Sequence, residues 1–166
     1  MGSALTKVSS LEHQRAVRIL GGIFAVAVVV SIVHYADNYV NYHDYPQPRT
    51  VPNPSAALVL GAWFGFTAAG IAGYLLFRRR PSDLALVLLA AYSGSGLVGI
   101  GHYLVPGATS MPWWRQVHVG LDIACGIAVL SFALWAARAR GAQSSENGVR
   151  GRSRRTPAKD TSTLSS

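Results

Sequence analysis

Two stretches of the sequence place a histidine about one helical turn from a carboxylate. In the first, His34, Asp37 and Asn38 stand at positions i, i+3 and i+4, so that one face of a helix presents all three side chains. The second stretch has the same character at positions i, i+3 and i+7, and its members are Arg115, His118 and Asp122. Both stretches lie inside or at the edge of strongly apolar sequence.

Three apolar stretches carry a histidine at a similar depth. Counting about 1.5 Å of rise per helical residue places His34, His102 and His118 within about 10 Å of the same membrane surface. An ionisable group in hydrocarbon costs at least about 2.5 kcal/mol on insertion scales, so such groups usually face the bundle interior and mark functional sites. We therefore expect one polar site in the outer half of the bundle, lined by His34, Asp37, Asn38, Ser95, His102, Tyr103, Arg115, His118 and Asp122.

These residue types suit several functions. Imidazole nitrogens bind zinc, copper, iron and nickel, and a carboxylate can complete the shell, which predicts a divalent metal held by His34, His102, His118 and Asp122. A histidine beside a carboxylate in a low dielectric can also exchange protons, and His118 with Asp122 is then the candidate catalytic pair of a lipid isomerase or hydrolase. A haem, a quinone or a proton relay is a further alternative.

A purely structural interpretation stands beside these functions, because buried polar pairs can lock the register of membrane helices. The protein would then be a scaffold with a polar core. The leading functional hypothesis is a polar site that binds a divalent metal or a small amphiphilic ligand, and the membrane enzyme and the scaffold are its alternatives.

The surrounding chain has the composition of a membrane protein. Of its 166 residues, 50% are hydrophobic and 13% are charged, whereas about a quarter of the residues of soluble domains are charged. A helical crossing of the hydrocarbon core needs about 20 apolar residues. The sequence predicts an all-α, four-helix transmembrane bundle with helices at about 19–39, 54–77, 82–105 and 112–137.

Local signals refine these elements. Ser82 is a candidate N-cap for the third helix, and the series Tyr35 to Tyr45 is typical of an interfacial aromatic belt. Small residues at i and i+4 allow close helix packing in lipid. Gly61 and Gly65 in the second helix have this spacing and are followed by Gly70 and Gly73. Ser95 and Gly99 have it in the third helix, with Gly94, Gly96 and Gly101 nearby. The sequence therefore predicts that these two helices are neighbours.

Basic residues are distributed unequally between the two ends of the predicted helices. One side receives Lys7, Arg15, Arg18, Arg78 to Arg80, Arg138, Arg140 and the basic tail, and the other receives Arg49 and Arg115. The positive-inside rule therefore predicts a plasma-membrane protein with both termini in the cytosol. The predicted organisation is a cytosolic segment 1–17, a transmembrane domain 18–140 and a disordered basic cytosolic tail 141–166.

The net charge of +8 could indicate nucleic acid binding, but no docking element for nucleic acid is present in the sequence. The expected partners are membrane lipids, whose anionic headgroups attract the basic flanks, and an amphiphilic ligand. The abundance of Ala, Gly, Val and Arg is typical of a GC-rich bacterial genome.

Overall fold

The computed structural model describes residues 2–46 and 52–153, and these residues form helices and no strand. The long helices are α1 (Gly2–Val40), α2 (Ala56–Arg79), α3 (Asp83–Leu97) and α4 (Trp113–Ser153). Three short 3-10 helices join them, η1 (Tyr42–Asp44), η2 (Val98–Leu104) and η3 (Ala108–Ser110). The prediction of an all-α fold is confirmed for this part of the chain.

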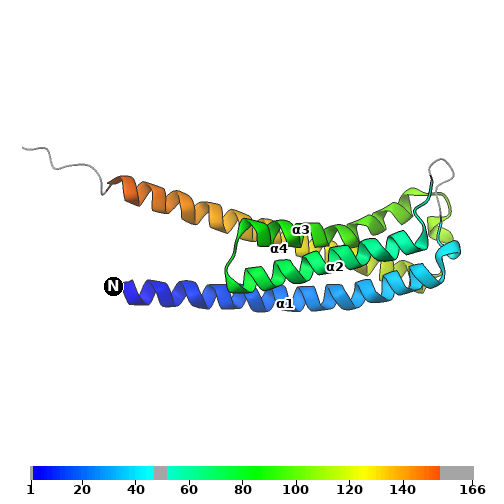
Figure 1. The fold of residues 1–166 in the computed structure, drawn as a ribbon, viewed down its shortest axis with the longest axis horizontal. Helices are drawn as coiled ribbons and strands as arrows, with labels where there is room; N and C mark the ends of the chain where they lie inside the picture. The colour runs from blue at the N-terminus through cyan, green and yellow to red at the C-terminus, as the bar shows by residue number, and fades with distance from the viewer. Residues whose placement is uncertain (1, 47–51, 154–166) are drawn as a thin grey trace, which may run out of the picture.

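The described residues contain four spans that are long and apolar enough to cross a membrane. They are Ser10–Val40, Ala56–Arg79, Asp83–Leu104 and Trp113–Ala142. The helices run side by side as an elongated bundle, and the start of α1, the connection from α2 to α3 and the last part of α4 lie at one end (Figure 1). We call this the arginine end, after Arg78, Arg79 and Arg80, and we call the opposite end the histidine end.

The bounds of two helices differ from those predicted. α1 begins at Gly2 instead of residue 19, and α4 continues through 141–153, where the sequence predicts a disordered tail. Neither extension contains proline, which would interrupt a helix. The α1 extension also contains Ala, Leu, Glu, Gln and Arg, which have high helix propensity, whereas glycine and serine are frequent in 141–153, so for α4 local preference does not explain the extension. Arg49 and the tail residues 154–166, which enter the topology and tail predictions, lie outside the described residues.

The third predicted helix is divided in two. Ser82 caps α3, with its Oγ accepting a hydrogen bond from the backbone nitrogen of Ala85 at 3.2 Å, which confirms the predicted start. The α-helix ends at Leu97, and the 3-10 helix η2 continues the span to Leu104. This stretch is rich in glycine, and glycine has a low preference for the α-helix.

Glycine brings α2 against α3, as the sequence predicted, at Gly70 and Gly73 rather than at the Gly61 and Gly65 pair. A Cβ on Gly70 would lie 2.7 Å from ring atoms of Phe24 and Tyr92, and one on Gly73 would lie 3.0 Å from the backbone nitrogen of Leu89. A Cβ on Gly61 or Gly65 would meet no described atom within 4 Å. The predicted pair Gly61 and Gly65 therefore does not form the contact.

The same device joins α3 to α4. A Cβ on Gly96 would overlap the carbonyl oxygen of Asp122, and it would lie 3.2 Å from the backbone nitrogen of Gly126. A Cβ on Gly126 would lie 2.8 Å from the carbonyl oxygen of Ser93. The backbones of α3 and α4 thus touch directly at the level of Asp122.

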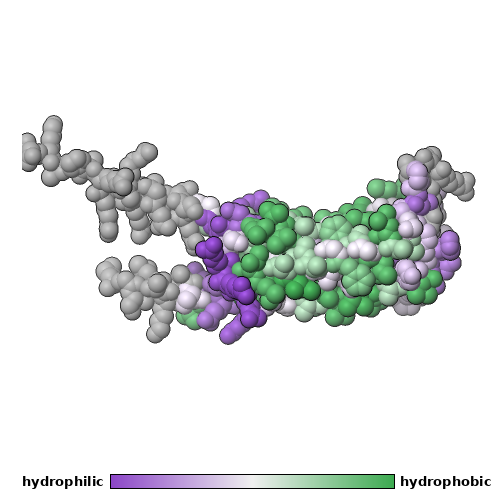
Figure 2. All heavy atoms as spheres, viewed as in Figure 1, coloured by the Kyte–Doolittle hydropathy of each residue, from purple (hydrophilic) through white to green (hydrophobic). Residues whose placement is uncertain are grey.

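The lateral surface of the bundle is apolar. Large hydrophobic side chains are exposed on every long helix, for example Val29, Ile71, Val87 and Leu121. Figure 2 shows a hydrophobic band along the bundle and hydrophilic residues towards both of its ends. Since the interior is also apolar, with Leu20, Leu89 and Val129 fully buried, the four helices are compatible with a membrane protein.

Candidate functional site

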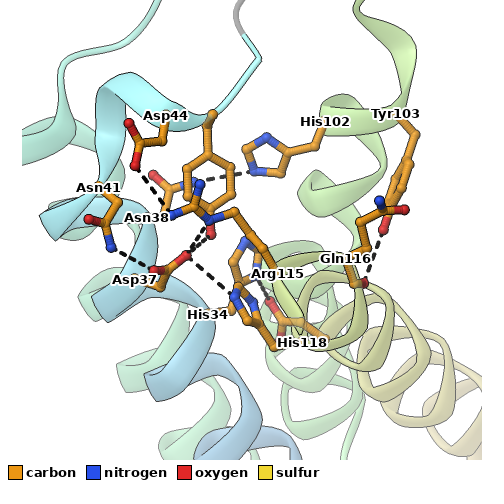
Figure 3. Close-up of polar contacts among 12 residues, drawn as sticks. His34, Asp37, Asn38, Asn41, Asp44, His102, Tyr103, Arg115, Gln116 and His118 are labelled. Carbon is orange, nitrogen blue, oxygen red and sulfur yellow. Dashed lines mark hydrogen bonds and ion pairs between the residues drawn. The ribbon is translucent and has the colours of Figure 1, made fainter. Parts of the chain in front are cut away.

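Polar side chains from α1, η2 and α4 meet at the histidine end of the bundle (Figure 3). The ring centroid of His34 lies 5.7 Å from that of His102 and 5.6 Å from that of His118. The three histidines come from three different segments of the chain. They lie close together, as their similar positions along the predicted helices led us to expect. The predicted lining residues thus form one cluster, except for two that are described below.

His34 and Asp122 form the innermost ion pair of this cluster. The Nδ1 of His34 and the Oδ2 of Asp122 are 2.7 Å apart, and 3% and 2% of these two residues remain exposed. A histidine that donates through Nδ1 to a carboxylate is held in one orientation, and its Nε2 is left for another partner. The contact ties α1 to α4 at the level where Gly96 brings α3 against α4.

Asp37 is the centre of a second group of contacts. Its Oδ2 accepts hydrogen bonds from Arg115 Nε at 2.9 Å and from Tyr45 Oη at 2.6 Å, and its Oδ1 accepts one from Asn41 Nδ2 at 2.7 Å. Arg115 also lies 3.5 Å from Asp44. Because Arg115 is only 4% exposed, water stabilises its positive charge little, and the carboxylates of Asp37 and Asp44 must do so instead.

A third group contains His102. The side-chain nitrogen of Asn38 lies 3.3 Å from His102 Nε2 and donates to it, and the ring of Tyr45 lies 4.8 Å from the ring of His102. The guanidinium of Arg115 lies over two aromatic rings, 4.8 Å from the centre of the Tyr45 ring and 5.0 Å from the centre of the Trp114 ring. Such stacking orients the arginine without neutralising it.

Two buried residues of the cluster retain unused hydrogen-bonding capacity. Among the described residues, Asn38 Oδ1 and both ring nitrogens of His118 have no hydrogen-bond partner. His118 Nε2 does lie 3.4 Å from Asp37 Oδ2, which is within reach of an ion pair but outside good hydrogen-bond geometry. An unpaired buried polar atom costs about 1–3 kcal/mol, so these atoms are notable within an otherwise well-paired network.

The predicted metal centre gains no support from this geometry. Within residues 2–46 and 52–153, no group of three or more His, Cys, Asp or Glu side chains is arranged to hold a metal ion. The four proposed ligands are close together, but the oxygen of Asp122 is directed to His34 and the Nε2 of His102 to Asn38. Nitrogens and oxygens that pair with each other are not available to a metal without rearrangement.

Two of the predicted lining residues lie apart from the histidines. Tyr103 is 39% exposed, and its hydroxyl donates to the backbone oxygen of Gln116 at 3.1 Å, which places it to one side of the cluster (Figure 3). Ser95 is buried, and its backbone oxygen accepts a hydrogen bond from Tyr35 Oη at 2.8 Å. Its contribution is therefore to anchor Tyr35.

Tyr35 and Tyr45 were predicted to belong to an interfacial belt, and both are instead buried, 7% and 4% exposed. The 3-10 helix η1 turns the chain back after the end of α1. This turn brings Tyr45 into contact with Asp37, which lies on α1. Burial, together with the hydrogen bond to Asp37, raises the pKa of the Tyr45 hydroxyl above its ordinary value. This hydroxyl therefore remains a donor at physiological pH. The sequence alone did not reveal this role of Tyr45, because the spacing of the tyrosines between Tyr35 and Tyr45 does not show which of them are buried and which are exposed.

The fold and the site belong to a recognisable physical class, a bundle of apolar helices with a buried network of ionisable side chains near one end. The chain matches no model of a known protein family, no curated protein and no solved structure in the comparisons made. Function must therefore be inferred from the contacts themselves.

Proposed function

We propose that the protein is embedded in the plasma membrane and that its histidine-end cluster binds a small amphiphile with a neutral, hydroxyl-bearing head group. The aliphatic part of this ligand lies among the helices or against the lipid. The head group hydrogen-bonds to the polar side chains of α1, η2 and α4.

The observation that carries this proposal is that two buried atoms, His118 Nδ1 and Asn38 Oδ1, have no partner among the described residues, whereas His118 Nε2 has only the 3.4 Å contact with Asp37. A network that only fixes helix register is most stable when every buried donor and acceptor is paired. A neutral imidazole has one donor and one acceptor, and Asn38 Oδ1 is an acceptor. A hydroxyl group both donates and accepts, so it can satisfy atoms of either kind.

The charges of the cluster support a neutral head group over an anionic one. The carboxylates of Asp37 and Asp44 contact the guanidinium of Arg115, and a third carboxylate, that of Asp122, contacts the imidazole of His34. Arg115 is already paired with Asp37 and Asp44, and His34 with Asp122, so an anionic head group would lie beside carboxylates of the same sign whose cationic partners are already engaged. A hydroxyl group adds no charge to this balance.

Ligand binding can be tested by thermal unfolding in nanodiscs of neutral phosphatidylcholine. The probes share one chain length and differ in head group: 1-dodecanol, dodecanoate and dodecylamine. At a hundredfold excess over its dissociation constant, a ligand stabilises the folded state by about 2.7 kcal/mol, which corresponds to a rise in Tm of several degrees. We expect this rise for dodecanol, and a smaller one or none for the charged probes.

Paired variants show whether the effect arises at the cluster. His118→Phe with Asn38→Leu removes the unpaired atoms and should abolish the response to dodecanol. Thr67→Val is the matched control, because Thr67 Oγ1 is also buried without a hydrogen-bond partner among the described residues but lies on α2. It should respond as the wild type does. An equal response in all three proteins, or none in the wild type, would favour the register-fixing scaffold.

Acid–base catalysis on a lipid-like substrate is a second candidate, favoured by the short contact between His34 Nδ1 and Asp122 Oδ2. This contact orients the imidazole as a general base requires. The pair differs from the predicted one, because Asp122 partners His34 rather than His118.

Mass spectrometry of lipids incubated with the protein would detect turnover, and elemental analysis of the same sample would detect a metal. Turnover that is lost in Asp122→Asn while binding persists would indicate an enzyme.

The membrane orientation belongs to the same proposal, with the arginine end in the cytosol. It is supported by the arginines beside α2 and by the positive-inside rule. In a background without Cys125, a cysteine at Thr109, which is exposed in η3, should react with an impermeant thiol reagent added to intact cells. A cysteine at Arg78 should react only after permeabilisation, and the reverse pattern would invert the orientation.

A further inference from the structure

A second feature lies at the arginine end of the bundle, opposite the end that holds His34, His102 and His118. There, α1, the connection from α2 to α3, and α4 line an open cavity of about 760 Å³. This volume falls within the range of small-molecule pockets, roughly 300–1,000 Å³. The cavity is separate from the histidine-end cluster and shares no residue with it.

The lining of the cavity is strongly basic. Arg15, Arg79, Arg80 and Arg140 all line it, and Glu12 is the acidic residue among its lining side chains. With histidine counted as neutral, four positive charges and one negative charge leave an excess of three. Arg140 is partly offset by Asp83, whose Oδ1 is 2.5 Å away. The remaining arginines still make this cavity complementary to an anion.

Apart from Ser10 and His13, the rest of the lining is apolar, and part of it reaches the lateral surface of the bundle. Ile19 and Trp135 line the cavity and are 48% and 54% exposed, so their side chains extend from it onto the outer surface. The hydrophilic band at this end directly adjoins the hydrophobic surface of the helices (Figure 2). The arginines lie at the end of the bundle, and Trp135 and Ile19 lie closer to its middle. This is the order of polarity found across a membrane interface.

We infer that this cavity binds an anionic phospholipid, with the phosphodiester held by Arg15, Arg79 and Arg80 and the start of an acyl chain against Ile19 and Trp135. Charge complementarity favours this occupant over a neutral lipid. The chain's own C-terminal tail carries Arg154, Arg155 and Lys159, so its charge is not complementary to that of the cavity. The inference requires insertion into a membrane but is independent of the ligand at the histidine end.

Native mass spectrometry of the full chain in detergent can test the inference, with phosphatidylglycerol and phosphatidylcholine of identical acyl chains as probes. We expect one equivalent of phosphatidylglycerol to bind with at least about tenfold higher affinity than phosphatidylcholine, since arginines near a membrane surface favour anionic lipid. Arg15→Gln combined with Arg79→Gln should reduce the affinity for phosphatidylglycerol by about tenfold or more.

The matched control is Arg18→Gln combined with Arg78→Gln. These arginines are exposed, belong to the same helices and lie at the same end, but they do not line the cavity. Their removal changes the net charge equally and should alter the affinity less than twofold. Equal losses in the two double variants would reduce the effect to general surface charge and overturn the inference. So would equal binding of the two lipids, or displacement of phosphatidylglycerol by millimolar inorganic phosphate, which would indicate a soluble anion.

Discussion

Gly96→Ala is expected to lower the free energy of unfolding by about 3 kcal/mol, at the upper end of the usual cost of overpacking. The added methyl group would overlap the carbonyl oxygen of Asp122 and crowd the backbone nitrogen of Gly126. Both obstacles are backbone atoms of α4, so no change of rotamer can relieve the clash. The two helices must separate, and membrane helices depend on such close packing for their association.

The measurement is unfolding of the purified protein by sodium dodecyl sulfate in mixed micelles, monitored by loss of helical circular dichroism. Gly61→Ala is the matched control, because its Cβ would meet no described atom within 4 Å. It should be neutral or stabilising by up to about 1 kcal/mol, since alanine favours the helix over glycine. If both variants had the same effect, the contact of α3 with α4 would not be made at Gly96.

This variant also has a consequence for the site. The residue that the new methyl group displaces is Asp122, and Asp122 holds His34 at 2.7 Å. Any fraction of Gly96→Ala that remains folded should therefore respond less to dodecanol than the wild type does. The packing of α3 on α4 and the geometry of the polar cluster are in this sense one structural feature.

Asp37→Leu is expected to destabilise the protein by about 3–5 kcal/mol, the usual cost of leaving a buried charge without its partner. Arg115 is 4% exposed and donates to Asp37 at 2.9 Å. Tyr45 and Asn41 would lose their acceptor at the same time. Asp44, 3.5 Å from Arg115 and largely exposed, is too far into solvent to replace it.

The same unfolding measurement on the double variant Asp37→Leu with Arg115→Met separates charge from packing. Replacing both members of a buried ion pair by apolar residues is often nearly neutral, so we expect most of the lost stability to return. Asp83→Ala is the surface control, since Asp83 pairs with Arg140 but its side chain is 92% exposed, and exposed pairs contribute little. A double variant no more stable than Asp37→Leu alone would show that the pair itself is not the source of the cost.

Hydrophobic length and composition are local properties, and they were sufficient to predict four helical spans. A crossing needs about 20 apolar residues wherever the chain goes next, so each of the four predicted stretches overlaps one of the four observed spans, although their ends differ. The cap at Ser82 is equally local, because the bond to the backbone of Ala85 spans only three residues. The convergence of the histidines also followed from the sequence, since depth depends on the rise per residue and not on neighbours.

The tertiary structure decided which side chains pair and which glycines pack. In a soluble helix, the apolar face marks the core, but here the surface and the interior are both apolar, so spacing could not distinguish Gly61 from Gly70. The partner of Asp122 depends on the rotation of α1 relative to α4, which places His34 against it instead of His118. Tyr45 reaches Asp37 only because η1 turns the chain back. The sequence by itself thus determined how far along the bundle each group lies, and packing determined which way it faces.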